Sequence, residues 1–308
     1  MFQGRRVLAI LNPSSGAGEG SSFADELPAT LTRHGASSVD VRVTQGPEDA
    51  FDWAAAAADE GFDLVLAGGG DGTVTAVGHG VMRSKAPFPI GIVPLGTGNG
   101  LARVLGLPLE PTETVDALAA GRLVAIDAVD LPSHDTISLL FFGAGLDAEI
   151  NREASAERKE RLGIMAYVVA AVRRLRGTRN HDLHLVLDTR EEHMRGHTVV
   201  GFNATRLQMF GFTMGPKAQP HDGRMEVAVL RNPGFWATLG QVVRLVSGSA
   251  SRRELEPANT LRLEADPPLR VQVDGDVVGE TPIEATVVHA ALRFIADASY
   301  EGDRARTS

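Results

Sequence analysis

The sequence predicts two domains, an α/β domain over residues 1–130 and an antiparallel β-sandwich over residues 131–296. Strand-like and helix-like segments alternate in the first part, which is typical of a largely parallel sheet with right-handed crossovers. Short β-like segments broken by Gly, Pro and Asp dominate the second part and favour antiparallel strands. The length of 308 residues fits two domains of roughly 100–200 residues each. We expect the remaining segment, about 297–308, to pack back on the first domain.

The elements of the first domain follow from its apolar runs and turn residues. Pro47 precedes an Ala-rich segment and suits the first turn of a helix. Pro28 would either kink the helix that it interrupts or mark its true start. The expected strands are 6–11, 39–43, 62–67 and 88–93, and the expected helices are 21–34, 47–60, 74–82, 101–105 and 112–120.

The elements of the second domain are mostly short runs of Val, Leu and Phe, which are typical of strands in a sandwich or barrel. Two segments, 157–176 and 234–247, are expected to be helices. The expected strands are 137–142, 183–188, 198–203, 225–231, 260–264, 269–273, 285–288 and 292–296.

The composition excludes several classes of protein. With 39 acidic and 30 basic residues, the formal charge of −9 argues against a general nucleic-acid binder, which needs a basic surface. The sequence lacks the GxxxxGK[ST] pattern of P-loop NTPases and contains no Cys, so thiolate metal sites and cysteine nucleophiles are excluded. No apolar run reaches the ~18 residues of a transmembrane segment. We therefore expect a cytoplasmic protein, with peripheral membrane contact left open.

The sharpest motif is the run from Gly68 to Thr73, which follows an apolar strand and precedes a helix. Glycines let the backbone approach a phosphate closely, and amides at a helix N-terminus favour an anion. Asp71 in the same turn would repel bare phosphate, but it suits a Mg²⁺ ion between them or a hydroxyl oriented for attack. The alternative interpretation is a tight turn with Asp71 as the N-cap.

Two further turns end neighbouring strands of the expected sheet. Residues 12–18 follow the first strand with small and hydroxyl side chains, and residues 94–102 again join a strand to a helix. Each turn alone is weak evidence for a ligand site. Because the carboxyl ends of parallel strands meet at one edge of a sheet, the three turns are expected to converge on one nucleotide site.

The segments NPSSGAG, GGGDGTV and PLGTGNGLAR, in this order, resemble the catalytic family of diacylglycerol kinases. That family includes sphingosine and ceramide kinases and soluble bacterial lipid kinases. The resemblance extends over about residues 5–296. Its later landmarks are FGAGLDAEI at 142–150, KERLGIMAY at 159–167, Asn203, residues 216–223 and residues 273–276.

The resemblance implies a Rossmann-like α/β domain of the NAD kinase and diacylglycerol kinase type, followed by a β-sandwich. It implies transfer of the γ-phosphoryl group of ATP, with Mg²⁺, to a hydroxyl of a diacylglycerol-like or sphingoid lipid at a membrane surface, in a cleft between the domains. The residues that it assigns to ATP binding are Asn12, Pro13, Ser14, Ser15, Gly16, Thr44, Gly69, Gly70, Asp71, Gly72, Thr73, Thr97 and Asn99.

The same resemblance assigns the catalytic carboxylates. Asp71 matches the phosphate–Mg²⁺ position, and the acceptor hydroxyl would be activated by Asp276 or by its rival Asp274. Taken alone, Asp274-Gly275 between two β-like runs is typical of a hairpin turn. The other matched positions are a second Mg²⁺ site at Gln219, Asp222 and Arg224, an acidic position at Asp127 and a basic position at Lys159.

The chain departs from the family pattern at Ala17, at Thr75-Ala76 and at Gly100, where the family commonly has Lys, Asn-Glu and Asp. These departures leave open an altered substrate or a catalytically weak member that binds nucleotide or lipid. An NAD kinase-like enzyme is the other alternative, which the absence of Asn-Glu at Thr75-Ala76 weakens. The lipid acceptor and the oligomeric state, including a homodimer, also stay open.

Some features lie outside this assignment. The basic, apolar segment 157–179 suits either a helix on anionic lipid or a buried domain helix. The apolar stretch 209–214 could line an acyl pocket or pack in the core. His181, His184, His193 and His197 crowd one expected hairpin, but their spacing fits no zinc template and favours ordinary hairpin histidines.

Overall fold

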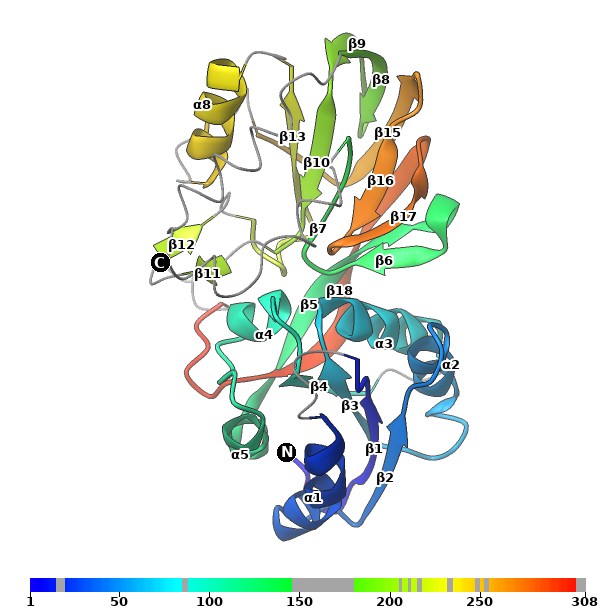
Figure 1. Ribbon diagram of the computed structural model, residues 1–308, viewed down its shortest axis with the longest axis vertical. Helices are drawn as coiled ribbons and strands as arrows, with labels where there is room; N and C mark the ends of the chain where they lie inside the picture. Colours follow the sequence, from blue (N-terminus) through cyan, green and yellow to red (C-terminus); the bar gives the residue numbers. More distant parts are fainter. Residues whose placement is uncertain are drawn as a thin grey trace. The chain divides into compact units, whose positions relative to one another are not determined.

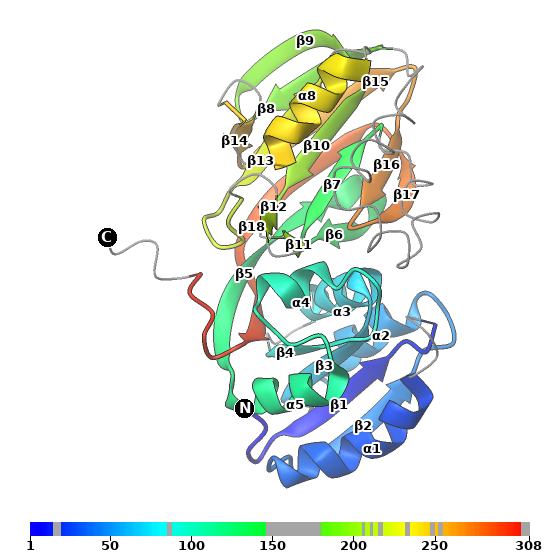
Figure 2. The same ribbon diagram turned by 60° about the vertical axis from the view of Figure 1, so that its left-hand side comes forward.

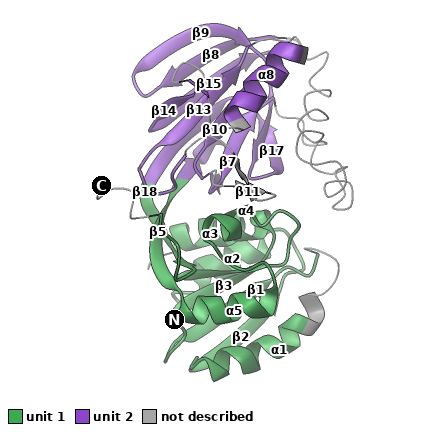
Figure 3. Ribbon diagram, turned by 90° about the vertical axis from the view of Figure 1, so that its left-hand side faces the viewer, with its two compact units in different colours: residues 1–128, 289–308 green, residues 129–288 purple. Residues whose placement is uncertain are grey.

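The computed structural model describes most of the chain in two compact units. The described residues are 1–14, 20–84, 88–145, 180–204, 207–209, 212–214, 218–231, 235–246, 250–251 and 255–302. Figures 1 and 2 show the ribbon from two directions, and Figure 3 colours the units. Unit 1 contains residues 1–128 and 289–308, and unit 2 contains residues 129–288.

Unit 1 is a parallel sheet with helices, as the alternating pattern predicts (Figure 1). Its strand order is β2-β1-β3-β4-β18, and the registered pairs between these neighbours are parallel. The strands are β1 (Arg6–Leu11), β2 (Ser38–Val43), β3 (Leu64–Gly69), β4 (Ile90–Pro94) and the end of β18 (Ile283–Ala296). The helices are α1 (Gly20–Arg33), α2 (Asp49–Ala56), α3 (Asp71–Arg83), α4 (Gly100–Val104) and α5 (Pro111–Ala120).

The order of these strands creates a topological switch point. The chain leaves β1 toward β2 on one side and then returns to place β3 on the other side of β1. Every residue of β3 is buried, and only Arg6 of β1 is exposed, because both faces of a parallel sheet are covered. In open α/β sheets, ligands bind beyond the carboxyl ends of the strands at such a point.

Unit 2 is built from antiparallel strands, as the short β-like runs predict (Figure 2). One sheet has the order β14-β13-β10-β7-β16-β17; in the other, β18 continues to β15, β8 and β9, and β5 pairs with β18 and β6. The strands are β5 (Arg122–Leu131), β6 (Thr136–Ser138), β7 (Phe141–Ala144), β8 (His181–Leu187), β9 (Arg190–Gly196), β10 (Thr198–Phe202), β11 (Leu207–Met209), β12 (Phe212–Met214), β13 (Met225–Leu230), β14 (Glu256–Ala258), β15 (Thr260–Asp266), β16 (Arg270–Val273) and β17 (Asp276–Glu280). The pair β11–β12 forms a separate sheet. Within the described part of unit 2, the helical segments are a 3₁₀ turn at Pro132–His134 and α8 (Phe235–Val246).

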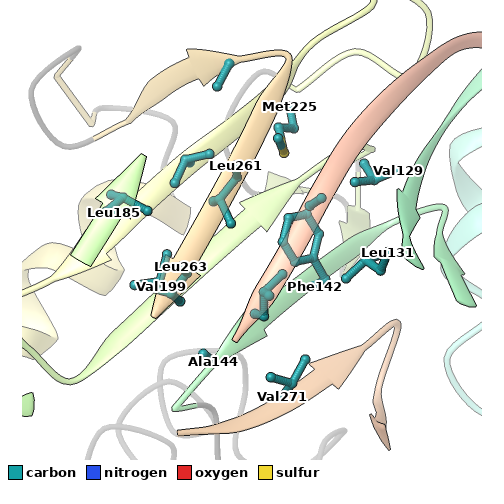
Figure 4. Close-up of a cluster of buried hydrophobic side chains, with 14 of the residues drawn as sticks. Val129, Leu131, Phe142, Ala144, Leu185, Val199, Met225, Leu261, Leu263 and Val271 are labelled. Atoms are coloured by element: carbon teal, nitrogen blue, oxygen red, sulfur yellow. The ribbon is translucent and has the colours of Figure 1, made fainter. Parts of the chain in front are cut away.

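Buried apolar side chains alternate with more exposed ones along the strands of unit 2, and the buried ones form its core. Leu183, Leu185 and Leu187 of β8 are buried, while the residues between them are partly exposed. Phe142 of β7, with 1% of its surface exposed, packs in the same cluster (Figure 4). The period of two places the apolar face of β8 inward and its polar face outward.

Several elements differ from the sequence-based expectation. The expected strands 285–288 and 292–296 form the single strand β18, which continues through Ala290 at a φ of 52°. The bounds of the polar strand β9 were not predicted, although its histidine was expected in a hairpin, and α1 continues through Pro28 from Gly20. The expected helix 157–176 lies outside the described residues.

Truncation of Phe142 tests how far unit 2 depends on this core. We expect Phe142→Ala to lower the free energy of unfolding by about 3–5 kcal/mol, because it leaves a cavity among buried strands. Urea denaturation followed by circular dichroism measures the change. The control Val277→Ala removes a side chain that is 50% exposed and should change stability by about 0.5 kcal/mol or less. Equal effects of the two substitutions would contradict the assigned core.

Candidate active site

Three loops leave neighbouring strands at the switch point of unit 1. The Asn12 amide after β1 donates to the Gly68 carbonyl at 2.8 Å, and the Leu95 amide after β4 donates to the Gly69 carbonyl at 3.0 Å. These bonds continue the sheet pairing β1-β3-β4 into the loops. The three turns therefore lie at one edge of the sheet, as the sequence predicts.

The loop after β1 contacts helix α3 through one side chain. Asn12 Nδ2 donates to Thr73 Oγ1 at 3.2 Å, and the Ser14 amide donates to Asn12 Oδ1 at 3.0 Å. Pro13 and Ser14 are exposed. Ser15 and Gly16, which the resemblance assigns to ATP binding, lie outside the described residues.

The loop after β3 runs directly into α3. Gly70 is the N-cap in an extended conformation, and its carbonyl accepts the first helical bond from Val74 at 3.1 Å. Asp71 is therefore the first residue of the helix, and the alternative interpretation of Asp71 as N-cap is wrong. Gly70, Asp71 and Gly72 are partly exposed. Helix amides and a carboxylate are thus accessible at one strand end.

The loop after β4 packs directly on the loop after β3. A Cβ on Gly96 would lie 2.5 Å from Gly70 Cα, so the two backbones approach too closely for any side chain at this position. Asp71 Oδ1 also accepts a bond from the Leu101 amide at 3.4 Å. Backbone contact and this bond join the two loops into one structure.

Asn99 and Arg103 shape the same loop. Asn99 is buried in the left-handed region at a φ of 50°. Its Oδ1 accepts from the Gly96 amide at 3.0 Å, and its Nδ2 donates to the Gly96 carbonyl at 2.7 Å. Arg103 Nε donates to the Gly98 carbonyl at 3.1 Å. The Asn99 side chain therefore holds the loop, whereas Thr97 is exposed at its tip.

Thr44 lies after β2, where its amide donates to the Leu11 carbonyl at 2.8 Å. Asp49 fixes the turn that follows, since its Oδ2 accepts from the amides of Gln45 at 2.7 Å and Gly46 at 2.8 Å. These two backbone hydrogen bonds lower the pKa of Asp49 because they favour its charged form.

Asp274 and Gly275 form a two-residue turn between β16 and β17. Val273 pairs with Asp276 across the turn, and φ is 48° at Asp274 and 110° at Gly275. Positive φ at both central residues is the geometry that Asp-Gly favours in a hairpin. Asp274 is 8% exposed, whereas Asp276 is exposed at the start of β17.

The carboxylate of Asp274 organises the segment before β7. Its Oδ1 accepts from Ser138 Oγ at 2.8 Å, the Leu140 amide at 3.0 Å and the Phe141 amide at 2.9 Å. Its Oδ2 accepts from the Leu139 amide at 2.8 Å. Four donors bind this carboxylate, so Asp274 holds residues 138–141 in place.

Asn203 holds the same segment from β10. Its Nδ2 donates to the Leu139 carbonyl at 3.0 Å, and its amide donates to the Leu140 carbonyl at 2.8 Å. Asn203 and Asp274 are far apart in the sequence, yet both bind residues 138–141. The sequence marked both positions but did not reveal this shared structural role.

The expected metal loop is a tight turn with oxygen donors. The Asp222 amide lies 3.4 Å from the Gln219 carbonyl, and Asp222 Oδ1 accepts from the Arg224 amide at 3.0 Å. Asn259, between β14 and β15, donates from its Nδ2 to the Gly223 carbonyl at 2.9 Å and fixes the turn. Carbonyl and carboxylate oxygens are the ligands that Mg²⁺ takes, so the donor set fits this ion.

Asp127 lies within β5 and is fully buried. Its Oδ1 accepts from the Ala290 amide at 2.7 Å and from His289 Nδ1 at 2.8 Å. The carboxylate thus supports the left-handed residue of β18. Lys159, the other matched position, lies outside the described residues.

Two family models match the chain. The diacylglycerol kinase catalytic domain matches residues 6–131, and the YegS C-terminal NAD kinase beta sandwich-like domain matches residues 141–296. A diacylglycerol kinase of Mycobacterium tuberculosis is 30% identical over 298 residues, which are 94% of each chain. The chain belongs to the diacylglycerol kinase catalytic family. It is therefore a phosphotransferase of the lipid kinase type.

Other relatives agree with this family. An uncharacterized protein of Synechocystis is 27% identical over 77% of this chain, which spans only 55% of that relative's length. A solved structure of a putative diacylglycerol kinase from Bacillus anthracis is similar to this chain, with a TM-score of 0.78 and a sequence identity of 21%. The similarity covers 96% of this chain and 97% of the Bacillus anthracis chain. At this identity the likeness supports the fold, an α/β domain followed by a β-sandwich. Among the described helices, none is both long and apolar enough for a membrane span.

Substitution of Gly96 tests whether the contact between the two loops positions the active site. We expect Gly96→Ala to lower phosphotransferase activity by about 10²-fold, because its methyl group forces the loops apart. A kinase assay on folded protein measures the loss. The control Gly46→Ala places a Cβ no closer than 3.8 Å to Asp49 Oδ1 and should keep the activity. Full activity of Gly96→Ala would contradict the role of the contact.

Proposed function

We propose that this chain transfers the γ-phosphoryl group of ATP, with Mg²⁺, to a hydroxyl of a diacylglycerol-like or sphingoid lipid. The observation that carries the proposal is the interlocked pair of loops after β3 and β4 at the switch point, in a member of this family. A membrane presents such lipids, so the enzyme would work in peripheral contact with a membrane surface.

The loops supply what a triphosphate needs. The first amides of the 13-residue helix α3 would donate to phosphate oxygens, and the helix dipole favours negative charge at this end. Asp71 in the first turn would hold Mg²⁺, which would offset the negative charge of the phosphates. Asn12, Thr44, Thr73 and Thr97 would complete the nucleotide contacts.

The proton of the acceptor hydroxyl requires a base. Asp276 is exposed and adjoins the turn that the buried Asp274 anchors, so we assign the base to Asp276 and a positioning role to Asp274. In the reaction the hydroxyl oxygen forms a bond to the γ-phosphorus while the bond to the bridging oxygen breaks. The proton passes to Asp276, and ADP leaves.

A second ion would have a structural role. The carbonyls of Gln219 and Arg224 and the carboxylate of Asp222 would hold Mg²⁺ and stabilise the loop before β13. The buried carboxylate of Asp127 would act by supporting β18 rather than by contacting substrate.

Transfer of label from ATP tests the proposed activity and the role of Asp71 together. We expect label from [γ-³²P]ATP to enter organic-soluble product with a panel of diacylglycerols, ceramides and sphingoid bases, with mass spectrometry naming the acceptor. Asp71→Asn should abolish this transfer because it loses the proposed Mg²⁺ ligand. The control Asp52→Asn changes an exposed carboxylate in the first turn of α2 and should retain transfer. Label only in NADP, or undiminished transfer by Asp71→Asn, would refute the proposal.

Two substitutions separate the base from its neighbour. We expect Asp276→Asn to lower kcat by about 10²–10⁴-fold with unchanged stability, since only proton transfer is lost. Asp274→Asn should lower the free energy of unfolding by about 1–3 kcal/mol, because an amide cannot accept from all four donors. Steady-state kinetics and urea denaturation of both variants measure these effects. The assignment fails if Asp276→Asn keeps its kcat while a folded Asp274→Asn loses it.

A further inference from the structure

A row of metal-ligating side chains crosses three strands of unit 2. Glu264 of β15 pairs with His184 of β8, and His184 pairs with His193 of β9. Glu191 lies two residues before His193 on the same strand, so its side chain is on the same face. β15, β8 and β9 are consecutive neighbours in the sheet (Figure 2). Three strands therefore present two imidazoles and two carboxylates together.

The ligand atoms lie close together. His184 Nε2 is 2.7 Å from Glu191 Oε1, and His193 Nε2 is 3.5 Å from the same oxygen. The ligand atoms of these three residues all lie within 4.8 Å of one another. The two imidazole rings stack at a centroid distance of 4.3 Å with an interplanar angle of 2°.

This cluster is on the solvent side of the sheet. Leu183 and Leu185 flank His184 in the strand and point into the core. The side chains of His184, Glu191 and His193 are 30%, 59% and 74% exposed. His184, His193 and Glu264 also line a shallow depression of about 580 Å³. An ion could enter from solvent, and water could complete its coordination.

Two arginines near the cluster are each paired with carboxylates. Glu264 pairs with Arg262 at 2.8 Å, and Arg262 also lies 4.0 Å from Glu284. Asp182 and Arg195, which line the same depression, pair at 3.3 Å.

We propose that His184, His193 and Glu191 bind a divalent transition-metal ion, with Zn²⁺ as the preferred ion. Two imidazole nitrogens and one carboxylate oxygen are common Zn²⁺ ligands. Bonds of about 2.0–2.2 Å to a shared ion place ligand atoms roughly 3–3.5 Å apart. Binding would therefore turn the two stacked imidazole rings toward the ion.

Glu264 gives the proposed site an outer ligand shell. Its Oε2 lies 3.7 Å from His184 Nδ1, on the ring nitrogen that does not face Glu191. Metal-bound imidazoles are usually oriented by a carboxylate or carbonyl at their second nitrogen. Glu264 is therefore the positioning residue, and the bound ion would join β8 to β9 across the hairpin.

Calorimetric titration of the full-length, untagged protein with ZnCl₂ in the absence of ATP tests the site. We expect saturable binding of Zn²⁺ that is lost in His184→Ala and in His193→Ala. Glu264→Gln should bind about 10- to 100-fold more weakly, because it loses the orienting charge. Zn²⁺ should also raise the Tm of the wild type but not that of His184→Ala.

The matched control is His34→Ala. His34 is also 30% exposed and lies 2.8 Å from Asp116, but it sits in unit 1, away from the proposed ligands. It should bind Zn²⁺ as the wild type does. Absence of saturable binding to the wild type overturns the proposal, as does wild-type binding by a folded His184→Ala.

Discussion

The contact between Gly96 and Gly70 is the constraint on which the candidate site depends. The backbones after β4 and β3 meet where a Cβ would lie 2.5 Å from Gly70 Cα, so neither loop can move without the other. Asn99 fixes the loop after β4 by accepting a hydrogen bond from the Gly96 amide. Asp71 accepts a hydrogen bond from the Leu101 amide of α4, the helix that follows this loop. The first turn of α3 is thereby held at the edge of the sheet. A preorganised loop pair binds phosphate without losing further conformational entropy.

In unit 2, the buried carboxylate of Asp274 likewise holds two segments together. Asp274 binds four donors of residues 138–141 while it forms the turn before β17. Asp276 follows this turn, so its position depends on Asp274. Asp274 is anchored in turn by residues 138–141, more than a hundred positions earlier in the chain. A motif of three residues combines a structural carboxylate, a turn glycine and the proposed base, which explains why the first and third are not interchangeable.

Local patterns predicted the alternating elements of unit 1 and the antiparallel character of unit 2, because apolar periodicity reflects burial directly. Strand β9 is largely polar, so apolar periodicity did not predict its bounds. Its partner β8 supplies the inward leucines. The continuity of β18 depends on the buried Asp127 bond to Ala290, which no local pattern encodes. Likewise, the sequence placed Gly96 and the four histidines in turns and hairpins. It could not show which backbones touch or which imidazoles face each other.

The central proposal is that the loops of unit 1 hold the nucleotide. The most direct test is a crystal structure with a non-hydrolysable ATP analogue and Mg²⁺. The account predicts the triphosphate against the first amides of α3, with Mg²⁺ at Asp71 and the loop containing Gly96 and Thr97 beside it. A nucleotide bound at another surface, with these loops empty, would contradict it.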